Sequence, residues 1–353
     1  MTTTKINFPL SKIQMPLNDA ANKLFNVVFG LPAAQALHVA HQLNLFEIIG
    51  PYEGLSLKEI EGALHLQQRP AQALVSMCVS LELLHLNSEQ KFTLTDTAKI
   101  YLLKESPFYM GGSLDLTLMN EEVYSFKSFK NALLDNASQI YKGAELFKTN
   151  EEQIEMAKYF TRCMHGKSIA MAGLWPNKID LSEHRCLLDV GGGSGAHSIG
   201  AVSRWPNLQA IVYDRPLVTD VANEYINQFG LADRIQTQVG DMWKDNFPLA
   251  DLHYYCDVFH DWTIEQCKFL VEKSFESLEP NGRIVIHEML FNEDKTGPSS
   301  VASYNIMMLL WTEGGQQLSR KELVGLLAEA GFSSIQIIPT GFGDWSLVEG
   351  WKK

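Results

Sequence analysis

The sequence is short of basic residues. Its 353 residues include 29 Lys and Arg against 41 Asp and Glu, which gives a net charge of −12 at pH 7. Because neutralising phosphates requires clustered positive charge, this balance argues against non-specific binding to nucleic acid. With 46% hydrophobic and 20% charged residues, the composition is that of a packed globular protein, and the length suggests about two domains.

Long apolar runs and metal-binding patterns are missing too. No stretch reaches the roughly 20 apolar residues that span a bilayer, and the polar start Met1–Lys5 lacks the apolar segment of a signal peptide. The five cysteines form no C-x-x-C pair and the ten histidines no H-E-x-x-H pattern. We therefore expect a cytoplasmic protein with reduced thiols, no membrane contact and no metal.

The first half has helical periodicity. From about Leu17 to Lys178, apolar residues recur at helical spacing. The stretch Ser56–Glu59 reads as a capping box, residues 69–84 as a second helix, and Lys91–Leu94 as a short β segment before another helix. One predicted apolar face comprises Ala36, Val39, Ala40 and Leu43, and another Leu57, Ile60 and Leu64.

This order of elements is typical of a winged helix, a fold often used to bind DNA. The would-be recognition helix carries Arg69 as its only basic residue and is otherwise largely apolar. A helix that reads a DNA groove needs polar and basic side chains, whereas an apolar helix must bury most of its surface. We therefore predict that residues 1–178 form a helical, winged-helix-like dimerisation domain, with a non-enzymatic regulator as the weaker alternative.

The second half, residues 179–353, has a different texture. From Arg185 onward, short β-branched runs alternate with amphipathic helices such as Thr263 to Leu278. This alternation predicts an α/β domain with a parallel, doubly wound sheet that binds ligands at the carboxyl ends of its strands. The predicted strands are Cys186–Val190, Gln209–Tyr213, Ile235–Val239, Leu252–Val258, Arg283–His287, Ile335–Ile338 and Ser346–Glu349.

A glycine-rich loop follows the first predicted strand. Gly191, Gly193 and Gly195 lie in a strand-to-helix turn, where glycines let a ligand approach the backbone closely. The glycines alone also fit a dinucleotide site. Asp189 discriminates, because a carboxylate just before the glycines would repel a pyrophosphate but suits the cationic methionyl end of S-adenosylmethionine.

Acids follow the next two strands as well. Asp214 ends the second strand, where a carboxylate can accept hydrogen bonds from ribose hydroxyls, although it could instead cap a helix. Asp241 and Met242 follow the third strand, where they could hold an adenine, or be a loop acid beside a core methionine. Together with Asp189, these acids favour an adenosine site.

A candidate acid–base pair follows the fourth and fifth strands. His260 precedes Asp261 and a predicted helix, at the end of the strand where ligands are expected. A histidine pKa near 6.5 suits removal of a proton from an acidic hydroxyl. Glu288 could orient the imidazole and stabilise its protonated form, or could be an ordinary surface acid.

Taken together, these motifs resemble the plant caffeate-type and animal acetylserotonin-type O-methyltransferases and their bacterial natural-product relatives. The resemblance runs over almost the whole chain. It is carried by the winged-helix half, Phe160–Ser168, Asp189–Gly195, Gly240-Asp241-Met242, His260-Asp261-Trp262, Glu288, Gly314-Gly315 and Ala330-Gly331-Phe332.

The resemblance implies a homodimer that uses S-adenosylmethionine to methylate a hydroxyl of a small acceptor. His260 would be the general base, with Glu288 its partner and Asp261 beside them. The resemblance also implies that the cofactor is held by the Gly191–Gly195 loop, Asp214, Asp241 and Met242, and that the acceptor pocket is lined by Met164, Met307 and Trp311.

The chain departs from the family pattern at two places. Where relatives carry a second Glu beside the histidine, this chain has Gln317, which cannot offset a positive charge. Where many relatives have Lys or Arg shortly before the histidine, it has Cys256 and Asp257. The first departure leaves two alternatives open for a protein that keeps the cofactor, namely C-methylation and a non-methylating rearrangement.

Overall fold

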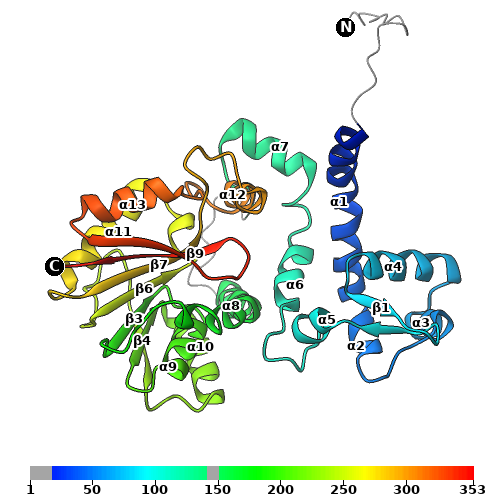
Figure 1. The fold of residues 1–353 in the computed structure, drawn as a ribbon, viewed down its shortest axis with the longest axis horizontal. Coiled ribbons are helices and arrows are strands. Elements are labelled where there is room, and N and C mark those ends of the chain that lie inside the picture. The colour runs from blue at the N-terminus through cyan, green and yellow to red at the C-terminus, as the bar shows by residue number, and fades with distance from the viewer. Residues whose placement is uncertain (1–17, 141–150) are drawn as a thin grey trace, which may run out of the picture. The chain divides into compact units, whose positions relative to one another are not determined.

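A computed structural model describes residues 18–140 and 151–353. The chain forms two compact units, Met1–Leu103 and Lys104–Lys353 (Figure 1). The sequence analysis expected the division at 178/179, whereas the helices between Lys104 and that point contact the helices of the second unit. The predicted polar start Met1–Lys5 lies outside the described residues.

The first unit is mainly helical, as the periodicity predicts. The capping box at Ser56 is confirmed, since its hydroxyl accepts the Glu59 N–H while the Glu59 carboxylate accepts the Ser56 N–H. The unit contains α1 (Asn18–Gln42), α2 (Leu45–Ile49), α3 (Leu57–Leu64), α4 (Gln68–Ser80), β1 (Leu84–Leu86), β2 (Phe92–Leu94) and α5 (Asp96–Tyr101), with β1 and β2 paired antiparallel.

Helix α1 leaves much of its apolar surface uncovered by its own chain. Within the predicted apolar face, Ala40 is buried, but Val39 and Leu43 are 41% and 37% exposed. Phe25 and Phe29 stack on each other with ring centroids 5.8 Å apart and are 53% and 60% exposed. The helix has more apolar residues than its neighbours α4 and α2 cover, which is the surface that the predicted dimerisation domain needs.

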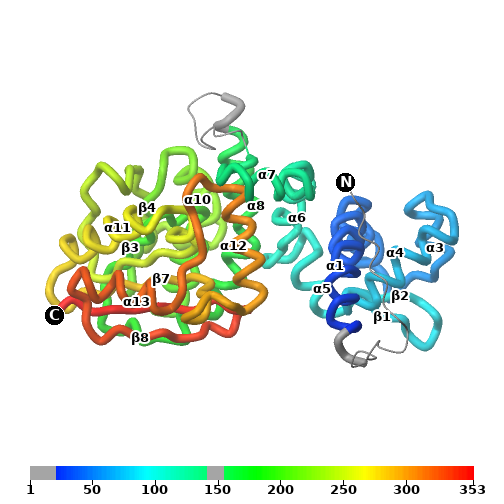
Figure 2. Tube along the Cα trace, turned by 90° about the horizontal axis from the view of Figure 1, so that it is seen from above, coloured from blue at the N-terminus to red at the C-terminus, as the bar shows by residue number. Residues whose placement is uncertain are grey.

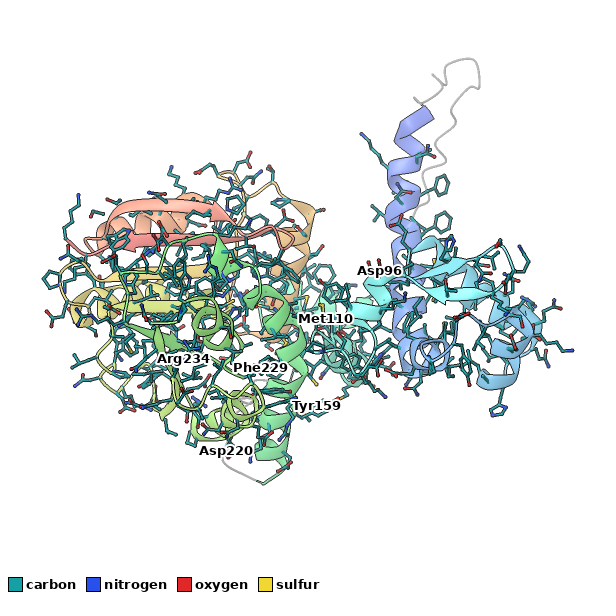
Figure 3. All side chains as sticks on the ribbon, turned by 60° about the horizontal axis from the view of Figure 1, so that its bottom comes forward. Asp96, Met110, Tyr159, Asp220, Phe229 and Arg234 are labelled. Carbon is teal, nitrogen blue, oxygen red and sulfur yellow. The ribbon has the colours of Figure 1, made fainter. Side chains whose placement is uncertain are left out.

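Three helices open the second unit, α6 (Gly111–Met119), α7 (Phe126–Asp135) and α8 (Glu151–Ala172). Helices α6 and α8 are close together, so a Cβ atom on Gly112 would lie 2.6 Å from the Cα atom of Cys163. Helix α8 is also tied to α10 (Pro216–Gln228) by the ion pair Lys158–Asp220 at 3.2 Å. Figure 3 labels Asp220 and the α8 residue Tyr159.

The sheet of the second unit has seven strands in the order β5-β4-β3-β6-β7-β9-β8. The predicted strand positions and the doubly wound α/β class are confirmed, with small shifts at strand ends. The strands are β3 (Cys186–Val190), β4 (Gln209–Asp214), β5 (Ile235–Val239), β6 (Leu252–Cys256), β7 (Arg283–Met289), β8 (Ser333–Pro339) and β9 (Trp345–Trp351).

The prediction of an all-parallel sheet is wrong for the last strand. β9 runs antiparallel to both of its neighbours, β7 and β8. The connection from β8 to β9 is a short hairpin, and a short connection can only reverse the chain, whereas a parallel strand needs a crossover.

Helices cover both faces of the sheet (Figure 1). One core packs α8, α9 (Ala196–Arg204) and α10 against the face that carries Tyr254 and Val285. The other core packs α11 (Ile264–Ser277) and α13 (Arg320–Glu329) against the face that carries Tyr255 and Ile286. Two 3₁₀ turns, η3 (Trp175–Asn177) and η4 (Phe259–Asp261), complete the unit with α12 (Ser299–Trp311), which lies beside α7 (Figure 2).

No helix within residues 18–140 and 151–353 is long and apolar enough to cross a membrane.

Candidate active site

Five neighbouring parallel strands, in the order β5-β4-β3-β6-β7, have their carboxyl ends on the same side of the sheet. This side is called the strand edge below. Each of the strands that the sequence analysis associated with a site delivers its residue there. Asp189 lies in β3, Asp214 ends β4, Asp241 follows β5, His260 follows β6 and Glu288 lies near the end of β7. Parallel pairing therefore brings together residues up to about 100 positions apart.

The loop after β3 needs its glycines. Gly191, Gly193 and Gly195 have φ angles of 68°, 56° and 73°, which L-residues with side chains rarely adopt. A Cβ atom on Gly193 would meet no atom of the described chain within 4 Å. The loop therefore presents open backbone at the strand edge, where a ligand can approach closely.

Asp189 is a buried carboxylate with one unused oxygen. It is 1% exposed, and its Oδ2 accepts a 2.7 Å hydrogen bond from the Ser198 hydroxyl. Its Oδ1 has no hydrogen-bond partner in the part of the chain that the structure describes. Burial raises the pKa of Asp189 to about 7. An unpaired buried acceptor is costly, and a cationic amine is the kind of donor that would satisfy it.

The acids after β4 and β5 are more open. Asp214 accepts the Gly193 N–H at Oδ2 (2.9 Å) and the Arg215 N–H at Oδ1 (2.7 Å), and each oxygen keeps a second lone pair. Asp241 accepts from the Trp243 N–H and from the exposed Lys244 ammonium, both at 2.9 Å.

Met242 is half-buried beside the second core cluster. Besides the glycine loop, the strand edge therefore carries the carboxylates of Asp214 and Asp241 and the thioether of Met242. The residues present fit S-adenosylmethionine, since the amine would meet Asp189 and the adenosine the acids after β4 and β5.

His260 and Glu288 form a buried pair at the same edge. The imidazole Nδ1 lies 2.7 Å from Glu288 Oε2, while Oε1 accepts the Phe259 N–H at 2.9 Å. Burial opposes protonation of His260, but the Glu288 and Asp261 carboxylates outweigh it and raise the pKa of His260 to about 9.

The bond to Glu288 determines which nitrogen can react. In a neutral imidazole, Nδ1 donates to Glu288 and leaves the lone pair on Nε2. Nε2 lies 3.5 Å from an oxygen of Asp261, whose side chain is 45% exposed. Nε2 is therefore the atom that can take a proton from a bound molecule.

A second buried ion pair lies beside His260, and the sequence analysis assigned it no role. Lys167 of α8 binds Asp257 at 2.6 Å, and the second oxygen of Asp257 accepts the Trp345 indole N–H at 3.0 Å. The Lys167 ammonium also lies 3.4 Å from the Tyr304 hydroxyl, and the Tyr304 ring contacts the His260 ring edge-on at 5.2 Å. No local pattern could have revealed a pair formed by residues 90 positions apart.

The expected acceptor-pocket residues lie on α8 and α12. Met164 and Met307 are half-buried on these helices. The Trp311 ring lies 6.4 Å from the ring of Phe160 and 6.2 Å from that of Tyr124. The three rings form an apolar group contributed by α12, α8 and the segment before α7.

The paired glycines sit against the histidine. A Cβ atom on Gly315 would lie 2.3 Å from the His260 carbonyl oxygen, and one on Gly314 would lie 2.7 Å from Thr263 Cγ2. Gln317 is 1% exposed, and both polar atoms of its side-chain amide are without a hydrogen-bond partner among the described residues. Its backbone N–H donates to Asn305 at 2.8 Å.

A cluster of possible metal ligands lies in the core beside this site. His197, Cys256 and His287 bring possible metal-ligand atoms within 4.8 Å of one another, but the Tyr254 hydroxyl already bonds Nδ1 of both histidines, at 3.2 and 2.8 Å.

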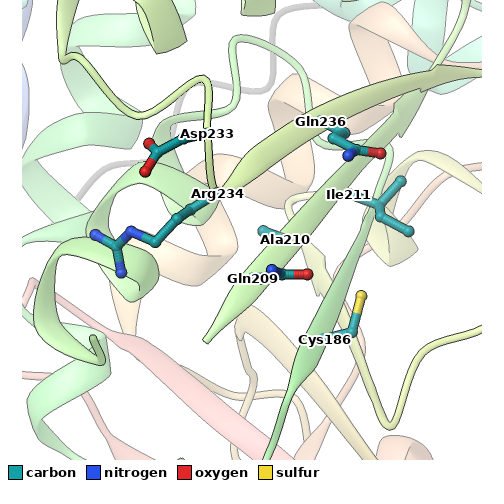
Figure 4. A pocket seen from close by; sticks show the side chains of 7 residues that line it. All are labelled: Cys186, Gln209, Ala210, Ile211, Asp233, Arg234 and Gln236. Atoms are coloured by element: carbon teal, nitrogen blue, oxygen red, sulfur yellow. The ribbon is translucent and has the colours of Figure 1, made fainter. Parts of the chain in front are cut away.

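A surface hollow lies at the amino ends of β3 to β5, opposite the strand ends described above (Figure 4). It is lined by Cys186, Gln209, Ala210, Ile211, Asp233, Arg234 and Gln236. This hollow is separate from the residues that the sequence analysis identified.

Comparison with known proteins points in one direction. Residues 126–333 match the O-methyltransferase domain, and residues 25–104 match the O-methyltransferase dimerisation domain. Human (Homo sapiens) acetylserotonin O-methyltransferase is 27% identical over 346 residues, which is 92% of this chain and 94% of the relative. The L-tyrosine C(3)-methyltransferase of Streptomyces lavendulae is 27% identical over 339 residues, or 91% and 89% of the two chains.

Among solved structures, human N-acetylserotonin methyltransferase in complex with SAM has a TM-score of 0.81 at 24% identity. The similarity covers 96% of this chain and 99% of that one. The fold is therefore shared over both units.

Proposed function

Because the chain belongs to the O-methyltransferase family, we propose that it transfers the methyl group of S-adenosylmethionine to a phenolic or enolic hydroxyl of a small acceptor. The observation that carries the proposal is the buried His260–Glu288 pair, at the same strand edge as the glycine loop. This edge places a proton acceptor next to a loop that can hold the methyl donor.

The cofactor would be held by residues from three strand ends. When bound, S-adenosylmethionine supplies an electrophilic methyl group on a sulfonium sulfur and leaves as S-adenosylhomocysteine. Asp189 would accept a hydrogen bond from the cofactor's amine. The backbone of Gly191, Gly193 and Gly195 would lie against the cofactor. Asp214 would accept from the ribose hydroxyls, and Asp241 and Met242 would hold the adenine.

The chemistry of the protein's own residues is proton removal and alignment. Nε2 of His260 takes the hydroxyl proton as the acceptor oxygen attacks the methyl carbon, and the Glu288 carboxylate stabilises the imidazolium that forms. Asp261, which faces Nε2, adds to that stabilisation. Holding both reactants in line supplies much of the rate acceleration.

The acceptor would lie against the apolar side chains of α8 and α12. Met164, Met307 and Trp311 offer polarizable and aromatic surface of the kind that packs a flat ring. The proposal therefore concerns a small aromatic or polyketide-like acceptor.

C-methylation is the second candidate. Gln317 cannot neutralise an imidazolium, so His260 has one carboxylate fewer than the family pattern gives it. A relative of similar identity is named as an L-tyrosine C(3)-methyltransferase. A non-methylating rearrangement on the same cofactor site shares this rationale, whereas a DNA-binding regulator does not, because α4 carries little charge.

Two measurements test the function. Isothermal calorimetry should show binding of S-adenosylhomocysteine and none of NAD, and the reverse result would remove the cofactor proposal. Incubation of the enzyme with phenolic and enolic acceptors, followed by mass spectrometry and NMR of the products, should show a methoxy group. A new carbon–methyl bond would replace the O-methylation proposal by the second candidate.

The assembly proposed here is a homodimer formed through the first unit. The match of residues 25–104 to a dimerisation domain and the exposed apolar residues of α1 support it. The cytoplasmic location expected from the sequence stays a prediction.

A further inference from the structure

We propose that Lys167 and Asp257 are positioning residues that set the charge balance of the His260–Glu288 pair. In this arrangement Asp257 adds a third carboxylate to those of Glu288 and Asp261, and Lys167 limits its effect. The inference rests on the proposed function, because it assigns a role in tuning the base of that same site.

Gln317, which stands where relatives carry a second Glu, is a buried side chain without charge. The amide is 1% exposed, and neither its Oε1 nor its Nε2 has a hydrogen-bond partner among the described residues. A neutral side chain without partners neither anchors the imidazole nor offsets its charge. Beyond the carboxylates of Glu288 and Asp261, any further anionic support for a protonated His260 must therefore come from a residue other than Gln317.

Asp257 is placed and held to give that support. One carboxylate oxygen of Asp257, one of Glu288 and one imidazole nitrogen of His260 all lie within 4.8 Å of one another. The Asp257 backbone is in the left-handed region, with φ of 54°. Its two carboxylate oxygens are fixed by Lys167 and by the Trp345 indole, so the charge cannot swing away from the histidine.

Lys167 limits what Asp257 contributes. The residue is 8% exposed, and its ammonium lies over the rings of Tyr304 and Trp345, 5.5 and 5.4 Å from their centroids. Burial opposes its charge, but Asp257 outweighs this and keeps the pKa of Lys167 above its ordinary value. The pair is therefore a buried ammonium and carboxylate whose fields nearly cancel at a distance.

The charged and titratable groups around His260 come from every side. They are Glu288 of β7, Asp261 of η4, Asp257 between β6 and η4, Tyr304 of α12, and Lys167 of α8 behind Asp257 and Tyr304. Three carboxylates thus face one imidazole and one ammonium. Removing a single member of the Lys167–Asp257 pair must shift the protonation of His260, and the direction depends on which member is removed.

A titration of His260 by NMR in the full-length protein tests the proposal without any substrate. Histidine is labelled with ¹³C at Cε1, and the His260 signal is identified by its loss in His260→Asn. Asp257→Asn should lower the titration midpoint of His260 by about one pH unit, and Lys167→Met should raise it by a similar amount. The double variant should return the midpoint close to that of the wild type.

Matched controls use an exposed ion pair in the same unit. Lys268 and Glu329 form a 3.2 Å pair with side chains 48% and 64% exposed. Lys268→Met and Glu329→Gln make the same charge changes and should leave the His260 midpoint unmoved. An unshifted midpoint in Asp257→Asn, or a raised one, overturns the proposal. If Lys167→Met does not fold, the midpoint measured in Asp257→Asn is sufficient to test the proposal.

Activity then separates this inference from the proposed function. The midpoint of the pH profile of kcat should shift to lower pH in Asp257→Asn and to higher pH in Lys167→Met, as the NMR midpoints do. If the midpoints move as expected while no acceptor is ever methylated, the proposed function fails and the charge balance stands. If the wild type methylates an acceptor and the midpoints do not move, the charge balance fails alone.

Discussion

His260 carries the clearest expectations at the scale of single residues. Because only a neutral imidazole accepts a proton and the pKa of His260 is about 9, kcat/KM should rise with pH through the neutral range and level off above about pH 9. His260→Ala should lower kcat at least tenfold, since acid–base catalysis typically contributes roughly 10²–10⁴-fold. Steady-state rates between pH 6 and 10 measure both effects.

A control and a second substitution sharpen this prediction. His85→Ala, at an exposed position of the first unit, should leave the profile unchanged. Glu288→Gln removes the carboxylate that most strongly raises the pKa of His260, so its profile should shift to lower pH. Turnover close to wild type in both His260→Ala and His260→Gln would show that another group takes the proton.

Asp189 links cofactor binding to stability. Burial raises its pKa to about 7, above the value near 3.9 expected of an unfolded chain. The folded state therefore holds the proton more tightly, and this group makes the free energy of unfolding fall as pH rises from about 4 to 7. Asp189→Asn removes that penalty and also the anionic acceptor.

Two measurements on Asp189→Asn check this expectation. The cofactor-free variant should melt at a higher temperature than the wild type at pH 8, with a smaller difference at pH 5. Calorimetry should show S-adenosylhomocysteine binding weakened by about tenfold or more. Undiminished binding would mean that Asp189 does not receive the amine.

The residues that sequence could and could not reveal differ in a physical way. His260 and Glu288 could be predicted as a pair because each lies at or just after the carboxyl end of a strand, and the carboxyl ends of parallel strands converge whatever their side chains are. Lys167 could not be predicted, because its partner is chosen by the packing of α8 on the sheet, which no local spacing encodes. The unpartnered amide of Gln317 also became visible only with its surroundings.

At the scale of elements, the turn after α12 controls the shape of the site. A Cβ atom on Gly315 would lie 2.3 Å from the His260 carbonyl oxygen, so Gly315→Ala must push η4 and the turn apart. We expect a loss of kcat of about tenfold or more, since small misplacements near the reacting atoms are costly. Steady-state kinetics and a thermal melt measure the result.

A second glycine provides the matched control. Gly325 lies within α13, and a Cβ atom there would meet nothing within 4 Å. Gly325→Ala should keep full activity and add about 0.5–1 kcal/mol of stability, because alanine is the better helix former. If both substitutions changed kcat equally, the prediction that the turn at Gly315 controls the site would be wrong.

Strands were easier to predict than their order. The β-branched runs identified each strand of the second unit to within a few residues, because the runs themselves are the local signal. The antiparallel insertion of β9 beside β7 was missed, because its direction depends on the hairpin after β8 rather than on the residues of the strand. Similarly, the periodicity of α1 predicted an apolar face but not what covers it, since the same spacing results from burial within a chain and from burial against a second subunit.

At the scale of the whole molecule, the exposed surface of α1 predicts the assembly. Phe25→Glu with Phe29→Glu places two charges on the stacked, half-exposed rings and should convert a dimer into monomers at micromolar concentration. Light scattering measures the mass. Leu249→Glu, on an 83% exposed leucine of the second unit, is the control and should leave the mass unchanged. A wild type that is already monomeric would contradict the homodimer.

The sheet order β7-β9-β8 also governs how the protein can be made. During synthesis, β7 leaves the ribosome before β8, yet β8 cannot join the native sheet until β9 has paired with β7. Every residue of β7 is buried in the finished fold, so the nascent chain carries an open, apolar strand edge until Trp345–Trp351 has emerged. We therefore expect the β7 edge to be the part of the folding sheet that is exposed to non-native pairing for longest.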